Sequence, residues 1–313
     1  MKTKIKHIII LFVLIISSLL YAKQTQAQQF DVTYQVFYDQ LSPYGQWVNY
    51  PNYGYVWMPD VGNDFQPYYS NGYWIMTDYG MTWVSEYNWG WAPFHYGRWD
   101  YDNYYGWFWI PDNEWGPAWV IWRRSRGYYG WAPMQPGVSI MISFGNQYNS
   151  NYDHWVFVRE RDLDRRNLYQ YHINHKANTQ IIIHSTVINN TYFDNSHRTT
   201  YVSGPDRQDL RRNMGRNVRS ASIYDINSPG RNQRNQELNI YRPNISNTNY
   251  KKEKVVPNKL SQLSEVKKYS ERNYQNKQIM QPNHNRGEEQ QNSYETNEYR
   301  MKKEQTIEAY NKN

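Results

Sequence analysis

The tryptophan residues of this chain recur in a fixed pattern. Each unit starts with Gly-x-Trp, continues through a polar stretch that contains tyrosine, and ends with Tyr/Trp-x-Trp-x-Pro. The first copy covers residues 45–59 and the third covers residues 97–111. Thirteen of the fourteen tryptophans fall between Trp47 and Trp131. A repeat this aromatic indicates how the region is built and says little about what it does.

The repeat predicts β-hairpins. Glycine and proline recur every few residues and would break helices, whereas aromatic residues at alternate positions favour strands. In the first copy we expect strands at 45–50 and 55–58 around a turn at 51–54. Further copies begin at Gly72 and Gly97, with a shorter fourth at 116–133. One hairpin alone is marginal in water, so several must share a core of large rings.

Tryptophans nine or ten residues apart should meet across each hairpin. The pairs in the first three copies are 47 and 57, 74 and 83, and 99 and 109. Aromatic pairs across strands stabilise a sheet by about 0.5–1.5 kcal/mol beyond the burial of their area. The spacing does not fix the register of the strands.

The first 27 residues read as a signal peptide. Three lysines at positions 2, 4 and 6 precede an apolar run over residues 8–20, and residues 25–27 end in a small-residue cleavage site. We therefore expect an exported protein in the periplasm or at the cell surface, with the alternative of an uncleaved N-terminal anchor. No later segment is apolar enough to span a bilayer, so an integral membrane protein is not expected after cleavage. The chain has no cysteine, which excludes disulfides and thiolate metal sites.

The chain divides into three regions by composition. Residues 28–136 form the hairpin repeat domain, 151–226 a small α+β module, and 227–313 a low-complexity tail expected to be disordered. The fold class is therefore mainly β. In the module the expected elements are strands at 154–158, 179–187, 199–203 and 218–226 and a helix at 205–214. Within the tail, leucine and valine at helical spacing suggest a short helix at 259–272.

Charge is distributed unevenly between these regions. Residues 28–150 carry 4 basic and 10 acidic residues, whereas residues 151–260 carry 18 basic and 10 acidic residues. Contact between the two regions is one reading, and two separately solvated surfaces are the other, because salt screens charges beyond about 8–10 Å.

Three motifs resemble a known family. Residues 89–99 read WGWAPFHYGRW, residues 117–124 read PAWVIWRR, and residues 55–59 read YVWMP. Together they resemble DUF6600, also described as YXWXP-repeat proteins, over about residues 44–136. The resemblance implies an exported bacterial protein of unknown function and transfers no catalytic residue.

No constellation of residues predicts catalysis, a cofactor or a metal site. His172, His175 and His184 have a spacing that imidazole ligands use, but no carboxylate completes the set. His95 lies inside a repeat motif, where a structural hydrogen bond is the simpler role. Asp100 with Asp102, and Asp112 with Glu114, are acid pairs in turns, whereas glycoside hydrolysis needs two carboxyl groups across a cleft.

A basic cluster lies early in the module. Arg159, Arg161, Arg165 and Arg166 stand near Tyr169 and Tyr171, which is a composition found in nucleic-acid binding. An exported protein seldom meets nucleic acid, and neighbouring acids dilute the charge. Contact with an anionic envelope polymer or with the acidic repeat domain is the preferred interpretation.

The aromatic rings allow two roles. They fill the core of a thin β-domain, or some of them stack on sugar rings, for which Trp57, Trp83 and Trp109 are the candidates. We therefore expect a non-catalytic envelope protein that acts as a scaffold or interaction module. The alternative is a module that binds glycan or peptidoglycan, and an envelope hydrolase is the third hypothesis. The expected partners are cell-wall glycan or another envelope protein.

Overall fold

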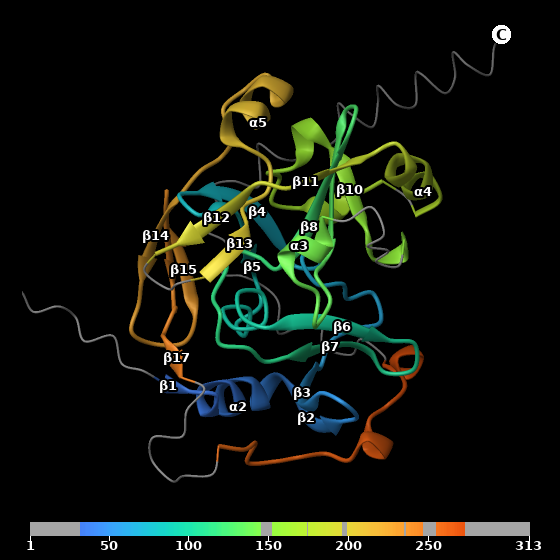
Figure 1. Ribbon diagram of the computed structural model, residues 1–313. Coiled ribbons are helices and arrows are strands. Elements are labelled where there is room, and N and C mark those ends of the chain that lie inside the picture. The colour runs from blue at the N-terminus through green and yellow to red at the C-terminus, as the bar shows by residue number, and fades with distance from the viewer. Residues whose placement is uncertain are drawn as a thin grey trace, which may run out of the picture. The chain divides into compact units, whose positions relative to one another are not determined.

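Four antiparallel β-hairpins make up most of the N-terminal half of the computed structural model (Figure 1). The structure describes residues 32–144, 152–173, 175–195, 199–234, 236–246 and 255–272. The expected signal peptide at 1–27 and residues 273–313 of the expected tail lie outside these ranges. Strands prevail over helices, so the prediction of a mainly β protein is confirmed.

The hairpins begin and end close to where the repeat predicts them. Their strands are β2 (Gly45–Tyr50) with β3 (Gly54–Pro59), β4 (Gly72–Thr77) with β5 (Gly80–Ser85), β6 (Arg98–Asp102) with β7 (Gly106–Ile110), and β8 (Val120–Ser125) with β9 (Tyr128–Pro133). In each hairpin two tryptophans lie directly opposite each other, at 47 and 57, 74 and 83, 99 and 109, and 122 and 131. The last pair shows that the fourth hairpin, shortened in sequence, keeps the same cross-strand arrangement.

The glycine of each Gly-x-Trp unit makes room for a ring of the return strand. A Cβ atom added to Gly45 would lie 2.7 Å from the Nε1 atom of Trp57, and one added to Gly72 would lie 2.4 Å from the Cζ2 atom of Trp83. The third hairpin repeats this contact. Side-chain carbons do not approach rings this closely, so the interior has no space for any residue larger than glycine here. The spacing of glycine and tryptophan in the repeat is therefore a packing requirement.

The hairpins combine into sheets with later parts of the chain. One four-stranded sheet has the order β2-β3-β7-β6, and a second has the order β10-β9-β8-β11, which adds β10 (Val156–Arg159) and β11 (Thr186–Ile188). Hairpin β4-β5 forms a sheet of its own, and β12 (Thr191–Asp194) pairs with β13 (Thr199–Val202). A three-stranded sheet has the order β14 (Ser222–Asp225), β16 (Glu237–Ile240), β15 (Arg231–Arg234), and β1 (Val32–Thr33) pairs with β17 (Ile245–Ser246).

The core of these sheets is aromatic. All fourteen tryptophans lie within the described residues, and each is at most 5% exposed. Trp74 shows the packing, since its ring centroid is 5.2 Å from that of Trp83, 4.6 Å from that of Trp122 and 5.5 Å from that of Trp131. The expected core of large rings is confirmed.

Many indole N–H groups in this core donate to backbone carbonyls. Trp47, Trp57 and Trp131 donate to Tyr38, Leu41 and Tyr68, over 2.8–3.2 Å. The Nε1 atoms of Trp74, Trp83, Trp99 and Trp122 have no hydrogen-bond partner among the described residues. The tryptophans that donate are fixed to the backbone by these hydrogen bonds. The tryptophans without a partner for Nε1 are held by the packing of their rings.

The repeat domain and the α+β module share one core, which corrects the expected separation into two domains. Strand β10 of the module pairs with β9 of the fourth hairpin, with Phe157 opposite Gly130. Phe157 of the module and Leu238 of the expected tail belong to the same hydrophobic cluster as the hairpin rings. The physical reason is the hairpin sheet itself, because its edge at β9 must be paired or covered.

Two helices depart from the sequence prediction. Residues expected to contain no helix form α2 (Gln35–Leu41), which buries Phe37 and Leu41. Of the strand expected at 179–187, residues 179–183 form the end of α4 (His175–Ile183), whereas residues 186–187 lie in strand β11 as expected. Isoleucine and threonine favour strands, but Asn178 and Ile182 are buried four residues apart on one side of α4. Tertiary packing therefore overrides the local preference.

Helix α5 (Arg207–Met214) confirms the helix expected at 205–214. The side chain of Asp206 caps its first turn by accepting from the N–H groups of Gln208 and Asp209, and Gly215 ends it with a φ of 66°. Pro205 precedes the cap rather than occupying the first helical position.

Other short helices lie between the longer elements. They are η1 (Ser42–Tyr44), α3 (Ile140–Ser143), η2 (Tyr152–His154), η3 (Glu160–Asp162) and η4 (Leu168–Gln170).

The expected disordered tail is ordered over its first part. Strands β15 (Arg231–Arg234), β16 (Glu237–Ile240) and β17 (Ile245–Ser246) follow residue 227, and Leu238 and Ile240 are each 1% exposed. The few apolar residues of this segment are thus placed where an existing core receives them, which composition alone does not reveal.

Residues 255–272 run along the outer side of the first hairpin (Figure 1). They contain two short 3-10 helices, η5 (Leu263–Glu265) and η6 (Tyr269–Glu271), in place of the single short helix expected between residues 259 and 272. Val266 completes a second apolar cluster with Val48, Val56, Met58 and Phe108. The segment therefore covers the face of the sheet that points away from the tryptophans. No described helix is both long and apolar enough for a membrane span.

Candidate functional site: an arginine-lined cavity

The three tryptophans expected to stack on sugars are inside the protein. Trp57, Trp83 and Trp109 are each 0% exposed. The indole of Trp57 donates to the carbonyl of Leu41 at 3.0 Å, and that of Trp109 donates to the carbonyl of Tyr96 at 2.7 Å. None of them offers a ring face to a ligand, so their expected role as stacking platforms is wrong. The repeat spacing that drew attention to them reports core packing instead.

The candidate histidines have structural partners. His95 is buried, its Nδ1 atom lies 3.0 Å from the carbonyl oxygen of Gly116, and its ring stacks on that of Trp115. The Nδ1 atom of His172 lies 2.9 Å from the hydroxyl of Tyr69, and that of His184 lies near the carbonyl of Gln180. The side chain of His175 lies outside the described part. Over the described ranges, no three histidine, aspartate or glutamate side chains gather in a way that would hold a metal ion.

One of the two acid pairs, Asp100 with Asp102, holds the tips of two hairpins together. The hydroxyl of Tyr50 donates to Asp102 at 2.7 Å, and the hydroxyl of Tyr53 donates to Asp100 at 2.9 Å. Burial raises the pKa of Asp102, but the bonds from Tyr50 and from two backbone N–H groups hold that pKa below its usual range. These carboxylates therefore accept hydrogen bonds within the fold. Burial and the nearby Asp112 raise the pKa of Glu114.

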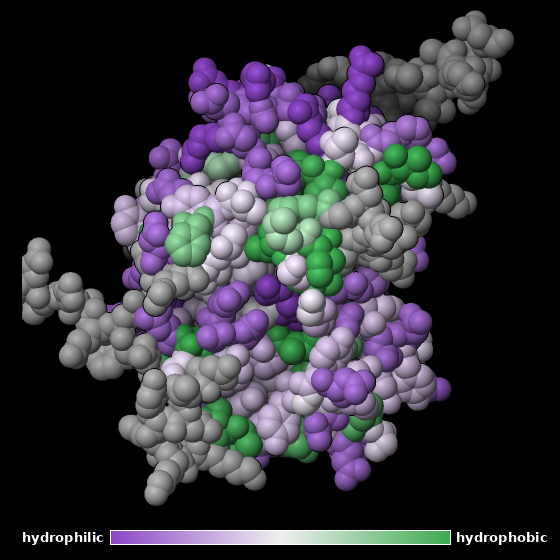
Figure 2. All heavy atoms as spheres, in the orientation of Figure 1, coloured by the Kyte–Doolittle hydropathy of each residue, from purple (hydrophilic) through white to green (hydrophobic). Residues whose placement is uncertain are grey.

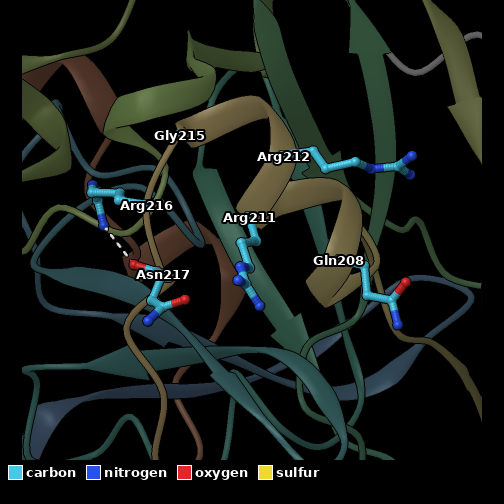
Figure 3. A pocket seen from close by; sticks show the side chains of 6 residues that line it. All are labelled: Gln208, Arg211, Arg212, Gly215, Arg216 and Asn217. Carbon is cyan, nitrogen blue, oxygen red and sulfur yellow. Dashed lines mark hydrogen bonds between the residues drawn. The ribbon is translucent and has the colours of Figure 1, made fainter.

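A cavity of about 730 Å³ lies beside the last turn of α5 (Figure 3). Its lining is more polar than apolar and consists of Gln208, Arg211, Arg212, Gly215, Arg216 and Asn217. The buried Leu210 anchors the helix to the core, and the cap residues Asp206 and Gly215 fix where the helix begins and ends. The polar side of α5 is thereby turned outward, where Figure 2 shows hydrophilic residues gathered over this helix.

The three arginines of the cavity differ in their partners. Arg216 forms a two-pronged ion pair with the carboxylate of Asp164, at 3.0 and 2.5 Å, and Arg212 pairs with Asp209 one turn back along the helix. Arg211 has no hydrogen-bond or ion-pair partner among the described residues. In Figure 3 it points toward the space between Gln208 and Asn217, whereas Arg212 extends away from it. Arg211 therefore carries an uncompensated charge into the cavity.

The pair between Arg216 and Asp164 holds the cavity wall. Burial raises the pKa of Asp164, but the Arg216 guanidinium and the N–H group of Arg219 outweigh this and hold that pKa below its usual range. The hydrogen bond to Asp164 in turn raises the pKa of Arg216. Arg216 also donates to the carbonyl oxygens of Arg161 and Asn217. Its position is therefore set before any ligand arrives.

This pair predicts how stability responds to acid. Because the folded pKa of Asp164 is depressed, its contribution is present at neutral pH and is lost as the pH falls below about 4, the usual range for this group. We expect Asp164→Asn to be less stable than the wild type by about 2 kcal/mol at pH 7. The difference in unfolding free energy between the variant and the wild type should become smaller toward pH 3, as measured by urea unfolding at each pH. A gap that stays constant with pH would show that Asp164 contributes no charge interaction.

The basic cluster expected at 159–166 lies near this cavity and is partly neutralised. Arg161 and Arg165 both lie within 3.8 Å of the buried Asp162, and Arg166 lies over the ring of Tyr73. The expected dilution by neighbouring acids is therefore confirmed for this cluster. Element η3, which carries Arg161, also contacts α5. The two basic segments thus form one surface.

The sequence alone did not single out Arg211. The signal that would have found the surface is the choice of basic residue. Between residues 28 and 250 the sequence has seventeen arginines and one lysine, Lys176. Arginine presents a flat fork of donors that matches carboxylate and phosphate groups, which lysine does not. Solubility alone does not demand such a bias.

Residues 38–138 match the model of a family of unknown function, DUF6600. The match begins within α2, ends just after β9 and covers all four hairpins, so the resemblance seen in the repeat motifs is confirmed. Comparisons with curated proteins and with solved structures gave no match. The arginine-lined cavity lies outside the matched residues.

Proposed function

Since residues 38–138 match the model of DUF6600, a family of unknown function, we propose a function that is argued from the surface of this chain. It is a non-catalytic binding protein of the cell envelope, in which a rigid aromatic core holds an arginine-lined cavity toward a negatively charged partner. The observation that carries the proposal is Arg211, which lines the cavity and has no partner among the described residues.

The interior supports a binding role over a catalytic one. The hydrogen-bonding groups that sequence reasoning weighed for catalysis, at His95, Asp100 and Asp102, are engaged by Gly116, Tyr53 and Tyr50. A core of close-packed rings gives a stiff support, and a stiff support lowers the entropy lost when a partner binds. Export through the signal peptide expected at 1–27 is part of the same proposal and places the partner outside the cytoplasm.

Binding to a charged polymer tests this role. We expect the full-length mature protein to bind dextran sulfate and not neutral dextran in thermophoresis, with an affinity that falls as salt rises. Arg211→Ala should weaken binding by about tenfold, which corresponds to the loss of one charge-assisted contact of about 1.4 kcal/mol.

Arg212→Ala is the comparison variant: Arg212 also lines the cavity, but it is paired and directed outward, so its loss should weaken binding less than Arg211→Ala does. Both arginines lie in the last turn of α5, so each complements the helix dipole to a similar degree. Arg212 is already paired with Asp209, and it points away from Arg211. Equal binding of dextran and dextran sulfate, or equal effects of the two substitutions, would contradict the proposal.

A second candidate function is glycan binding at the hairpin tips. Tyr53 is 39% exposed and Tyr104 is 48% exposed, and the ring of Tyr53 stacks against Tyr50. Exposed rings of this kind, beside a carboxylate such as Asp100, have the composition of a sugar platform. Sedimentation with peptidoglycan sacculi that survives high salt and is lost in Tyr53→Ala would favour this function over binding through Arg211.

A further inference from the structure

The cavity has a second chemical property besides charge, and it comes from its two amide side chains. Gln208 and Asn217 line the cavity on either side of Arg211, and both are exposed (Figure 3). Each amide carries two N–H donors and a carbonyl acceptor, which is the set that a sugar hydroxyl satisfies both ways. The guanidinium of Arg211 only donates and prefers an anion.

The lining also lacks what other ligands need. It contains no aromatic ring and no aliphatic side chain. A nucleobase would therefore find no ring to stack on and a lipid tail no aliphatic side chain to pack against, because the apolar part of the lining comes only from carbon atoms of these polar residues and of Gly215. The lining suits a ligand that is mainly polar and carries a negative charge.

The fixed part of the cavity favours a ligand larger than a single ion. Arg216 is committed to Asp164, Arg161 and Asn217 and defines one wall. The hollow of about 730 Å³ is open to solvent, and all six of its lining residues are exposed, so a bound group can extend beyond it. One carboxylate or phosphate fills only a small part of it, so the remaining room belongs to the group that carries the charge.

From these observations we infer that the cavity binds an acidic saccharide. Its anionic group pairs with the guanidinium of Arg211, and hydroxyl groups of the same sugar bond to the amides of Gln208 and Asn217. This inference rests on the proposed function, because it names the class of partner that the arginine-lined cavity takes.

Two polycarboxylates separate sugar recognition from simple attraction of charge. Oligogalacturonate carries carboxylates together with hydroxyls, whereas polyacrylate of matched charge carries carboxylates alone. At equal ionic strength we expect the full-length mature protein to bind oligogalacturonate about tenfold more tightly than polyacrylate in titration calorimetry. Neutral galactan, which has hydroxyls without charge, should bind most weakly of the three.

Variants assign this preference to particular side chains. Gln208→Ala with Asn217→Ala should abolish the preference for oligogalacturonate by weakening its binding far more than that of polyacrylate, whereas Arg211→Ala should weaken the binding of both polymers. The backbone carbonyl of Asn217 that accepts from Arg216 remains in the alanine variant. Circular dichroism of α5 and of the sheets serves as the folding check for each variant.

The outcomes distinguish the inference from the function on which it rests. Equal binding of oligogalacturonate and polyacrylate, both weakened by Arg211→Ala, would overturn saccharide recognition while an anion-binding role stands. Binding of neither polymer would overturn both. A preference for oligogalacturonate that survives in the double amide variant would place sugar recognition elsewhere on the molecule and also contradict the inference.

Discussion

Replacing Trp74 by alanine is expected to cost about 3–5 kcal/mol of folding stability, the range for emptying a large buried aromatic site. The ring lies at the meeting point of two hairpins, in contact with Trp83, Trp122 and Trp131, and is 0% exposed. A domain of this kind is stable by roughly 5–15 kcal/mol in total, so much of that margin should disappear. Urea unfolding, followed by far-UV circular dichroism, measures the loss.

Two further substitutions serve as controls for the stability loss in Trp74→Ala. Trp74→Phe removes part of the ring and no hydrogen bond, because the Nε1 atom of Trp74 has no described partner, so its cost should be clearly smaller. Tyr224→Ala removes a ring that is 50% exposed and should change stability by about 0.5 kcal/mol or less. If Trp74→Ala were no more costly than Tyr224→Ala, the ring would not be part of a packed core.

Replacing Gly72 by alanine, which adds a single methyl group, should cost about 3 kcal/mol, at the upper end of the usual range for overpacking. The added carbon would lie 2.4 Å from the Cζ2 atom of Trp83 and 2.7 Å from the carbonyl oxygen of Val84. Trp83 cannot move aside easily, since its ring contacts Trp74 and Tyr68. Thermal and urea unfolding of the variant report the cost.

Gly127→Ala provides the comparison for Gly72. Gly127 has a φ of +83° but has nothing within 4 Å of an added Cβ atom. Its substitution should therefore cost only the backbone strain, about 1 kcal/mol. If Gly72→Ala destabilises the protein no more than Gly127→Ala does, the close contact between glycine and the tryptophan ring is not the reason for glycine in the Gly-x-Trp unit.

The hairpins were predictable because their signals are local. Turn residues such as Asn52 and Gly54, which adopt positive φ, and alternating aromatic residues both act within about ten residues of sequence. Helix α5 was predictable for the same reason, since Asp206 and Gly215 mark its ends. In these elements local preference and the final fold agree.

The segments whose structure was predicted wrongly depend on contacts with residues far away in the sequence. The residues at the end of α4 have strand preferences, and they are helical because Asn178 and Ile182 pack against the core. Leu238 and Val266 lie in a segment whose composition is that of a disordered tail, yet each finishes a cluster built by residues far away in sequence. Composition measures how much a segment can bury by itself, and these segments bury their apolar groups against surfaces built elsewhere.

The candidate site was the least predictable part. Ring-rich repeats drew attention to Trp57, Trp83 and Trp109, and sequence periodicity does not separate a buried ring from an exposed one. Arg211 and Asn217 come together only because α5 ends at Gly215 and the chain turns back. The bias toward arginine over lysine was visible in the sequence and pointed toward anion recognition without locating it.

Tryptophan fluorescence of the mature protein, titrated with acrylamide, tests most directly whether the aromatic repeat is a sealed core. The account predicts a blue-shifted emission, weak quenching of all fourteen tryptophans and no change in quenching when a saturating acidic saccharide is bound. Strong quenching of a substantial fraction, reduced by a bound glycan, would contradict it and return the tryptophans to the role of ligand platforms.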